Sequence, residues 1–354
     1  MKELIIHIGY PRTGTKALQF FFSRNRFLLL KDYGIFYPES LCPGQIESHF
    51  PLAYSLGVDP IRIGDNLIFP PQLDYISTFS LLEKELISLY PHFKKVVLSS
   101  EHFINVKPIK IKKLIKDLSE FFDSFKIAVY FRRQDFYIES YYKQLVLDDS
   151  VRLSYNIGDF LPFSDKALKL DYYGFLMKLW DEVGVEIIPL VYDKKNLIGG
   201  SVISDFFQRV LGIELNLPGT DSYEHISLTT ESTLALRRLN EEYGKDIHTS
   251  VRNIIIDALR FLDGSYGTLR NYLLTFPERI EILEKYKESN CNFFEDFFGS
   301  ENRFVLDEEE KRDFHKLEIE ANESLVDREI NLRYDFVVSS FIRRRVGKAE
   351  IVGF

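Results

Sequence analysis

A glycine-containing loop with several cationic and hydroxyl side chains follows the first apolar run of the chain. It lies within HIGYPRTGTKALQ, residues 7–19, where Gly9 and Gly14 remove side chains so that backbone N–H groups can approach an anion. A helix that begins near Thr15 would add its unpaired N–H groups and the positive end of its dipole. Arg12, Thr13, Thr15 and Lys16 add side-chain donors, and Pro11 belongs to the same binding loop. The sequence therefore predicts an oxyanion-binding loop.

The loop differs from the phosphate loop of nucleoside-triphosphate enzymes in the order of its residues. Gly9 and Gly14 have the spacing of the pattern G-x-x-x-x-G-K-[ST], but Thr15 and Lys16 follow in the inverted order. No hydroxyl is therefore placed on magnesium in the usual way, and a cation comes early, at Arg12. The alternative interpretation is that this segment is only a turn from a strand to a helix.

The segment YPRTGTKALQ resembles the 5′-phosphosulfate loop of sulfotransferases, whose pattern is Pro, Lys or Arg, Ser or Thr, Gly, Thr. The resemblance implies a P-loop-like fold and 3′-phosphoadenosine 5′-phosphosulfate (PAPS) as the sulfuryl donor, with no metal. It also implies that Arg12 faces the leaving oxygen, where many sulfotransferases have Lys. Because Arg stays charged and is a poor acid, its role at that oxygen would be electrostatic.

A second segment, YFRRQDFYIESYYKQ, carries a further match to the same family. A predicted strand ends at Arg132, and Ser140 lies eight positions later on the following helix. In sulfotransferases an Arg and a Ser with this spacing grip the 3′-phosphate of PAPS, so the resemblance assigns that role here. The guanidinium fork matches phosphate oxygens. The alternative for Arg132 and Arg133 is ion pairing with nearby carboxylates such as Asp135 or Glu139.

A third, weaker match is LVYDKKN, where the last predicted strand of the core ends at Tyr192. In many sulfotransferases an aromatic residue at this place lies beside the adenine. The alternative is that Tyr192 only covers the end of a strand.

The acceptor hydroxyl of such a reaction needs a general base, either a histidine or a carboxylate. The predicted strand KKVVLSS ends directly at Glu101, at the place where related enzymes carry their base, so Glu101 is the leading candidate. Helix capping or a salt bridge with a neighbouring lysine is its alternative role. His49 is the second candidate, because it lies in a segment that often borders the acceptor. His102, Glu39 and Glu47 stay open and unranked, and His102 would point away from the site if the strand continued.

Short apolar runs that alternate with amphipathic segments predict the elements that hold these residues. Near-continuous apolar runs are typical of strands buried on both faces of a parallel sheet. The predicted strands are 3–9, 94–100, 126–132 and 185–192, and the predicted helices between them are 15–31, 109–122 and 201–213. Gly34 should end the first helix. We therefore expect the α/β class, with a P-loop-like three-layer core and a central parallel sheet over residues 1–213, and a mostly helical region packed on it over residues 214–354.

The composition limits the classes of function. The chain has 354 residues, a formal net charge of -8 and two cysteines. The negative charge disfavours a nucleic-acid partner, and the distant cysteines favour a reducing, cytoplasmic compartment without disulfides. No run approaches the length of a transmembrane segment. Neither the acceptor nor the oligomeric state can be read from these features.

These observations lead to one principal hypothesis and two alternatives. The motifs are most similar to those of bacterial sulfotransferases of the carbohydrate type, so the principal hypothesis is transfer of a sulfuryl group from PAPS to a hydroxyl acceptor, a sugar or polysaccharide, by in-line displacement. The first alternative is a P-loop kinase, which would need magnesium and an Asp at a strand end. The second is a non-catalytic relative that binds a nucleotide or a glycan.

Overall fold

The computed structural model describes residues 1–44, 46–63, 66–68, 70–193, 195–215, 227–266, 272–320 and 323–342. The chain divides into two compact units. The α/β unit consists of Met1–Arg133, Lys169–Glu224 and Glu288–Asn302, and the helical unit consists of Gln134–Leu168, His225–Lys287 and Arg303–Phe354. Both units are built from several chain segments.

This division differs from the boundary predicted after residue 213. The segment that follows Arg133 packs on later helices, because α6 (Gln134–Leu147) contacts α10 (Thr230–Tyr243) and α12 (Phe276–Lys285). Residues 288–302 return to the α/β unit, where Phe293 packs edge-on against Phe131 with 5.1 Å between the ring centres. Packing between apolar residues that are far apart in the sequence thus determines which segments form each unit. Because each unit contains three separate segments, a single boundary in the sequence cannot describe the division.

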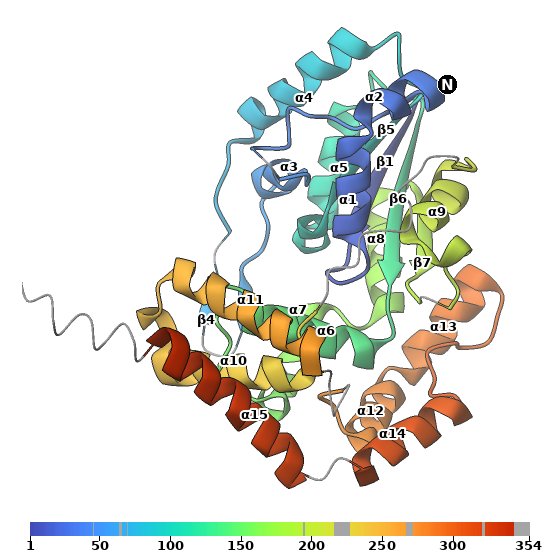
Figure 1. The fold of residues 1–354 in the computed structure, drawn as a ribbon. Coiled ribbons are helices and arrows are strands. Elements are labelled where there is room, and N and C mark those ends of the chain that lie inside the picture. The colour runs from blue at the N-terminus through green and yellow to red at the C-terminus, as the bar shows by residue number, and fades with distance from the viewer. Residues whose placement is uncertain are drawn as a thin grey trace, which may run out of the picture. The chain divides into compact units, whose positions relative to one another are not determined.

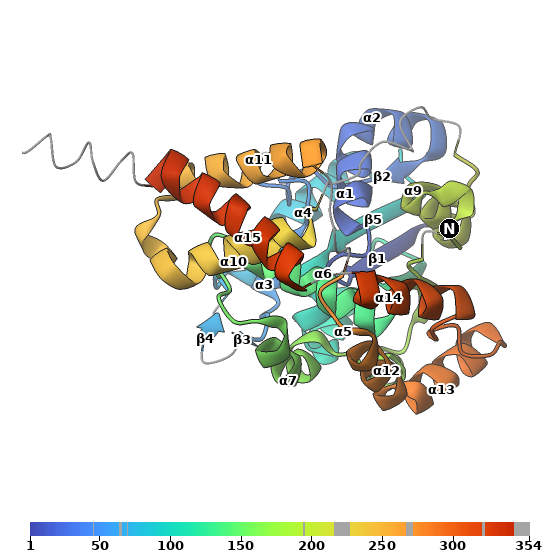
Figure 2. The same cartoon turned by 60° about the horizontal axis from the view of Figure 1, so that its bottom comes forward.

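The α/β unit contains a five-stranded parallel sheet among its described residues, in the order β2-β5-β1-β6-β7; Figure 1 labels β5, β1, β6 and β7, and Figure 2 labels β2. The strands are β1 (Glu3–Gly9), β2 (Ile35–Phe36), β5 (Lys95–Ser100), β6 (Ser124–Phe131) and β7 (Glu186–Val191). The four strands predicted from the sequence are present, and their ends differ from the predicted ones by at most two residues. The edge strand β2 was not predicted, because two residues are too few for a periodic signal.

Helices cover both faces of this sheet, so the α/β class and the three-layer core are confirmed. Tyr130 and Phe131 are successive residues of β6 and point to opposite faces. Tyr130 belongs to a buried cluster with residues of α1 (Thr15–Arg24) and α9 (Val202–Phe206), whereas Phe131 contacts Tyr172 and Phe175 of α8 (Tyr172–Val183). The amphipathic helix α5 (Pro108–Asp117) packs beside α8.

The remaining elements of the α/β unit are short or peripheral. Gly34 adopts φ 66° and ends the first helical segment, as predicted, and Gly212 ends the segment of α9 with φ 67°. These elements are α2 (Arg26–Leu28), η1 (Leu29–Tyr33), α3 (Phe50–Ser55), β3 (Ile61–Ile63), β4 (Asn66–Ile68), α4 (Tyr75–Leu89), η2 (Glu101–Asn105), η3 (Ile198–Gly200), η4 (Phe207–Leu211) and α13 (Lys287–Phe298).

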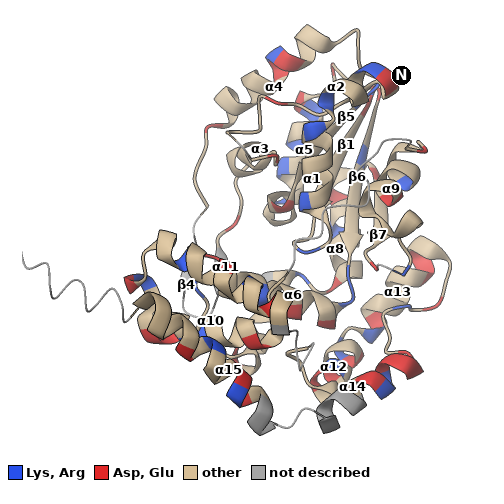
Figure 3. Ribbon diagram, viewed as in Figure 1, with Lys and Arg blue, Asp and Glu red and all other residues tan. Residues whose placement is uncertain are grey.

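The helical unit is held together by apolar packing and by buried ion pairs. Arg279 of α12 is completely buried and donates to Asp135 at 2.8 Å and to Glu139 at 2.5 Å, both on α6. The helices α10, α11 and α15 lie side by side (Figure 2), and α12 and α14 carry both basic and acidic residues (Figure 3). The other elements of this unit are α7 (Ile157–Leu168), η5 (Gly244–Asp246), α11 (Thr249–Tyr266), α14 (Glu308–Glu320), α15 (Glu323–Val337) and η6 (Val338–Ile342).

Candidate functional site

Three chain segments leave the central part of the sheet side by side at its carboxyl edge. Strand β1 pairs with β5 on one side and with β6 on the other, so that Ile8 lies beside Ser100 and Gly9 beside Tyr130. Glu101 therefore follows β5 and Arg132 follows β6 on the two sides of the loop that follows β1. In open α/β sheets ligands bind at this edge, so the fold gathers the predicted loop, the second cation and the leading base candidate at one place.

The loop itself is a tight turn held by its own hydroxyl groups. Arg12 and Gly14 have φ values of 68° and 79°, in the left-handed region. The Oγ1 of Thr13 donates to the carbonyl of Tyr10 at 2.7 Å, and the Oγ1 of Thr15 lies 3.4 Å from the same oxygen. Both hydroxyls thus lie at the inside of the turn, and their predicted contact with an anion stays a prediction. The two threonines therefore help to shape the loop, whose backbone and cationic groups are further donors for an anion.

Both glycines of the loop are required by close packing. A Cβ atom at Gly9 would lie 2.4 Å from the Oγ1 of Thr15. The last residue of β1 must therefore lack a side chain if α1 is to begin at Thr15. A Cβ atom at Gly14 would lie 2.9 Å from Val202 and 3.0 Å from the ring of Tyr192. Tyr192 therefore lies against the loop, and its predicted contact with adenine stays a prediction.

The first turn of α1 offers a positive helix end to an anion. Gly14 is the N-cap residue, and no side chain of the described residues makes a capping hydrogen bond there. The first turn contains no acidic residue, and the exposed Lys16 adds a positive charge. An uncapped helix N-terminus with adjoining cations stabilises a bound phosphate or sulfate group. Pro11, half-buried in the preceding turn, shapes the backbone and donates no hydrogen bond.

Arg12 and Arg132 interact beside this helix end. The Nη1 of Arg132 donates to the carbonyl of Arg12 at 3.2 Å, and its guanidinium lies 5.8 Å from the ring centre of Tyr192. Burial, and then the positive charge of Arg132, lowers the pKa of Arg12. A nearby anion would relieve this repulsion between like charges. The pair is therefore suited to an anion with more than one negative group.

Ser140, the predicted partner of Arg132, lies in α6 and belongs to the helical unit, whereas Arg132 belongs to the α/β unit. Its side chain is half-buried. Its role at a 3′-phosphate stays a prediction from the sequence resemblance. Arg133, the last residue of the first segment of the α/β unit, is buried.

Glu101 begins a short 3-10 helix, η2, directly after β5. Its half-buried carboxylate accepts a hydrogen bond from the Nε2 of Gln19 at 3.2 Å. The strand ends at Ser100, so Glu101 and His102 both belong to η2. The alternation of side chains along a strand, which would turn His102 away from Glu101, therefore does not apply to them. The Nε2 of His102 lies 3.3 Å from the hydroxyl of Tyr54, and burial lowers the pKa of His102 while the charge of Glu101 opposes this shift. Glu101 is therefore a carboxylate held beside α1, the helix that starts at the loop.

The structure argues against His49 as a base. Its ring is completely buried, its Nδ1 accepts from the backbone N–H of Ser99 at 2.9 Å, and its Nε2 donates to the carbonyl of Pro38 at 2.9 Å. Both ring nitrogens are thus used by the fold, and burial lowers the pKa of His49 to about 3. His49 joins the segment before α3 to strand β5 and serves as a structural residue.

Sequence reasoning missed three residues next to Glu101. Gln19, Ser99 and His7 are all buried and form a chain of hydrogen bonds that ends at this carboxylate. Two spacings could have indicated them. Gln19 lies one helical turn after Thr15, and Ser99 lies two residues before Glu101, a spacing that puts side chains on one face wherever the chain is extended.

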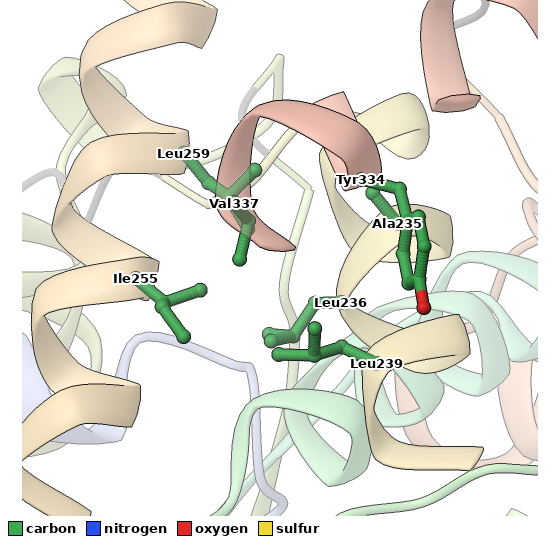
Figure 4. A pocket seen from close by; sticks show the side chains of 7 residues that line it. All are labelled: Ala235, Leu236, Leu239, Ile255, Leu259, Tyr334 and Val337. Atoms are coloured by element: carbon green, nitrogen blue, oxygen red, sulfur yellow. The ribbon is translucent and has the colours of Figure 1, made fainter. Parts of the chain in front are cut away.

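The helical unit contains an apolar hollow between α10, α11 and α15 (Figure 4). The residues that line it are Ala235, Leu236, Leu239, Ile255, Leu259, Tyr334 and Val337. The hydroxyl of Tyr334 is buried and has no hydrogen-bond partner among the described residues. Aliphatic walls and one hydroxyl provide no acid, base or anion-binding group in this hollow.

Comparison with known proteins shows a relative in an archaeon. An uncharacterized protein of Archaeoglobus fulgidus is 34% identical over 256 residues, which cover 70% of this chain and 66% of that protein. The chain thus spans just under two thirds of the length of this relative. No family model matches the chain, and no solved structure matches it. Among the described residues no helix combines the length and the apolar character of a membrane span. The protein is therefore similar to an uncharacterized archaeal protein.

Proposed function

We propose that this protein is a sulfotransferase that moves the sulfuryl group of PAPS to a hydroxyl acceptor of the carbohydrate class. The observation that carries the proposal is the order of the central strands. Because β5, β1 and β6 are neighbours, Glu101, the glycine loop and Arg132 leave the sheet at the same edge. A base candidate and an anion-binding loop with a second cation therefore flank one helix N-terminus.

The positive groups fit a donor that carries a sulfated phosphate and a second phosphate. The uncapped first turn of α1 and Lys16 would hold the 5′-phosphosulfate. Arg12, which shares its surroundings with Arg132, would stabilise the negative charge that develops on the leaving oxygen. Arg132 would bind the 3′-phosphate, and Tyr192 would lie beside the adenine.

The proposed chemistry is one displacement at sulfur. The acceptor hydroxyl oxygen forms a bond to sulfur while Glu101 takes the hydroxyl proton. The bond between sulfur and the bridging oxygen of the 5′-phosphate breaks, and that oxygen leaves with the electron pair beside Arg12. The products are a sulfate ester and 3′,5′-adenosine diphosphate. The residues act by positioning the reactants and by stabilising charge.

Calorimetric titration tests the proposal. The purified protein is titrated with 3′,5′-adenosine diphosphate and, separately, with ATP, each with and without magnesium. We expect tight binding of 3′,5′-adenosine diphosphate that does not depend on magnesium, and weaker binding of ATP. Binding of ATP only, and only with magnesium, would favour the kinase alternative and refute the proposal.

A further inference from the structure

Gln19 connects the Glu101 carboxylate to the interior of the sheet. The Gln19 side chain is 3% exposed, and its Nε2 lies 3.2 Å from Oε2 of Glu101 and 3.3 Å from Oγ of Ser99. An ionised carboxylate only accepts hydrogen bonds, so the amide nitrogen of Gln19 must face it. The two amide protons can thus serve one acceptor each, which fixes the orientation of the amide group.

The far end of this chain of hydrogen bonds is anchored in the core. Ser99 Oγ lies 2.8 Å from Nδ1 of His7, whose ring packs edge-on against Tyr130 and Phe206. Burial lowers the pKa of His7 to about 3, so this imidazole is neutral near pH 7. A neutral group with such a low pKa cannot store a proton that leaves the acceptor. His7 and Ser99 therefore support Gln19 and do not relay protons.

The same helix that begins at the glycine loop also carries Gln19. Gln19 lies one turn after Thr15 on α1, and Thr15 is the first residue of that helix. A rigid helix thus fixes the distance between the anion-binding turn and the group that contacts Glu101. The alignment of a base with the attacked sulfur depends on such a fixed distance, because a displacement of about 1 Å can cost roughly 10²-fold in rate.

We infer that Gln19 is a positioning residue that orients the Glu101 carboxylate toward the acceptor hydroxyl, with Ser99 and His7 as its buried support. This inference rests on the proposed sulfotransferase function. Gln19 itself neither gains nor loses a proton during the reaction, since an amide is neutral and not basic near pH 7. Its effect should therefore fall on the rate of the chemical step and leave the binding of the nucleotide unchanged.

The test uses water as the acceptor, so that the natural acceptor need not be known. Sulfate release from ³⁵S-labelled PAPS is measured for the native protein and for Gln19→Met, which keeps the length of the side chain but removes both donors. We expect kcat to fall by about tenfold to a hundredfold with KM for PAPS unchanged. Affinity for 3′,5′-adenosine diphosphate, measured by calorimetry on the same samples, should match that of the native protein and shows that the variant is folded.

Two further comparisons separate positioning from general stability. Ser99→Ala removes the support of Gln19 and should lower kcat less than Gln19→Met does, while Ser99→Thr, which keeps the hydroxyl, should restore it. Gln208→Met is the matched control, because Gln208 is exposed on η4 and should leave every quantity unchanged. If Gln19→Met binds the nucleotide normally and has the kcat of the native protein, the role of Gln19 is refuted but the proposed function is not. Absence of nucleotide binding in the native protein would instead overturn the proposed function, and with it the role of Glu101 as a base.

Discussion

The guanidinium of Arg132 donates a hydrogen bond to the backbone carbonyl of Arg12, although the two residues lie 120 positions apart in the chain. The bond joins the end of β6 to the loop after β1. It also supports Arg12 in a left-handed conformation, which costs a non-glycine residue of the order of 1 kcal/mol or more. Arg132 therefore helps to shape the loop that contains Arg12, and both residues bring positive charge to the start of α1.

The first prediction concerns nucleotide affinity. Arg132→Ala should weaken the binding of 3′,5′-adenosine diphosphate about tenfold to a hundredfold, because loss of a charged hydrogen-bonded contact costs roughly 1.5–3 kcal/mol. Calorimetry measures the change. Arg24→Ala is a suitable control, because Arg24 lies in the last turn of α1, at the opposite end from the loop. Equal affinity in the native protein and in Arg132→Ala would contradict the assignment of Arg132.

The second prediction concerns the packing of the loop. Gly14→Ala should destabilise the protein by about 1–3 kcal/mol, because Gly14 has a positive φ and its new Cβ would meet Val202 and Tyr192. Urea unfolding at constant pH measures this loss. Gly57→Ala provides the comparison, since Gly57 has φ 89° but no described atom within 4 Å of an added Cβ. If Gly14→Ala lowers the free energy of unfolding no more than Gly57→Ala does, the close contact with Val202 and Tyr192 does not contribute to the destabilisation.

The third prediction decides whether Glu101 or its neighbour His102 is the general base. Glu101→Gln should abolish sulfate release from PAPS while the affinity for 3′,5′-adenosine diphosphate stays the same, because the variant keeps the size of the side chain but cannot accept a proton. His102→Asn should retain most of the rate, since the His102 ring contacts Tyr54. The opposite pattern, a normal rate in Glu101→Gln and none in His102→Asn, would move the base to His102.

The fourth prediction concerns the pH dependence of stability. Burial lowers the pKa of His7 and of His49 to about 3, compared with 6.5 in the unfolded chain. Between these values the unfolded state binds protons that the folded state does not, so the free energy of unfolding falls as the pH falls from 6.5 toward 3. Each histidine should account for a loss of about 1.4 kcal/mol one pH unit below 6.5.

Urea unfolding over this pH range measures the loss. His7→Phe, which suits the aromatic neighbours Tyr130 and Phe206, should remove the share of the pH dependence that comes from His7, whatever its effect on stability at pH 7. An unchanged slope in this variant would show that His7 can take up a proton in the folded protein.

Local sequence patterns were sufficient for the elements that carry the site. Continuous apolar runs predicted β1, β5, β6 and β7, because strands buried on both faces need apolar residues at every position. The glycine pattern predicted the loop, and Gly34 predicted the end of the first helical segment. These features depend on neighbours within a few residues, so a single sequence contains them.

The sequence by itself thus determined the class of the fold, the loop and the strand ends at which Glu101 and Arg132 stand. Only the tertiary structure decided that His49 is enclosed by backbone hydrogen bonds, that Gln19 reaches Glu101 across 82 positions, and that residues 134–168 join the later helices. The physical reason is that strand order and burial arise from packing between distant segments. The residues of one segment determine which helix or strand that segment can form. The segments against which it packs depend on apolar surfaces elsewhere in the chain.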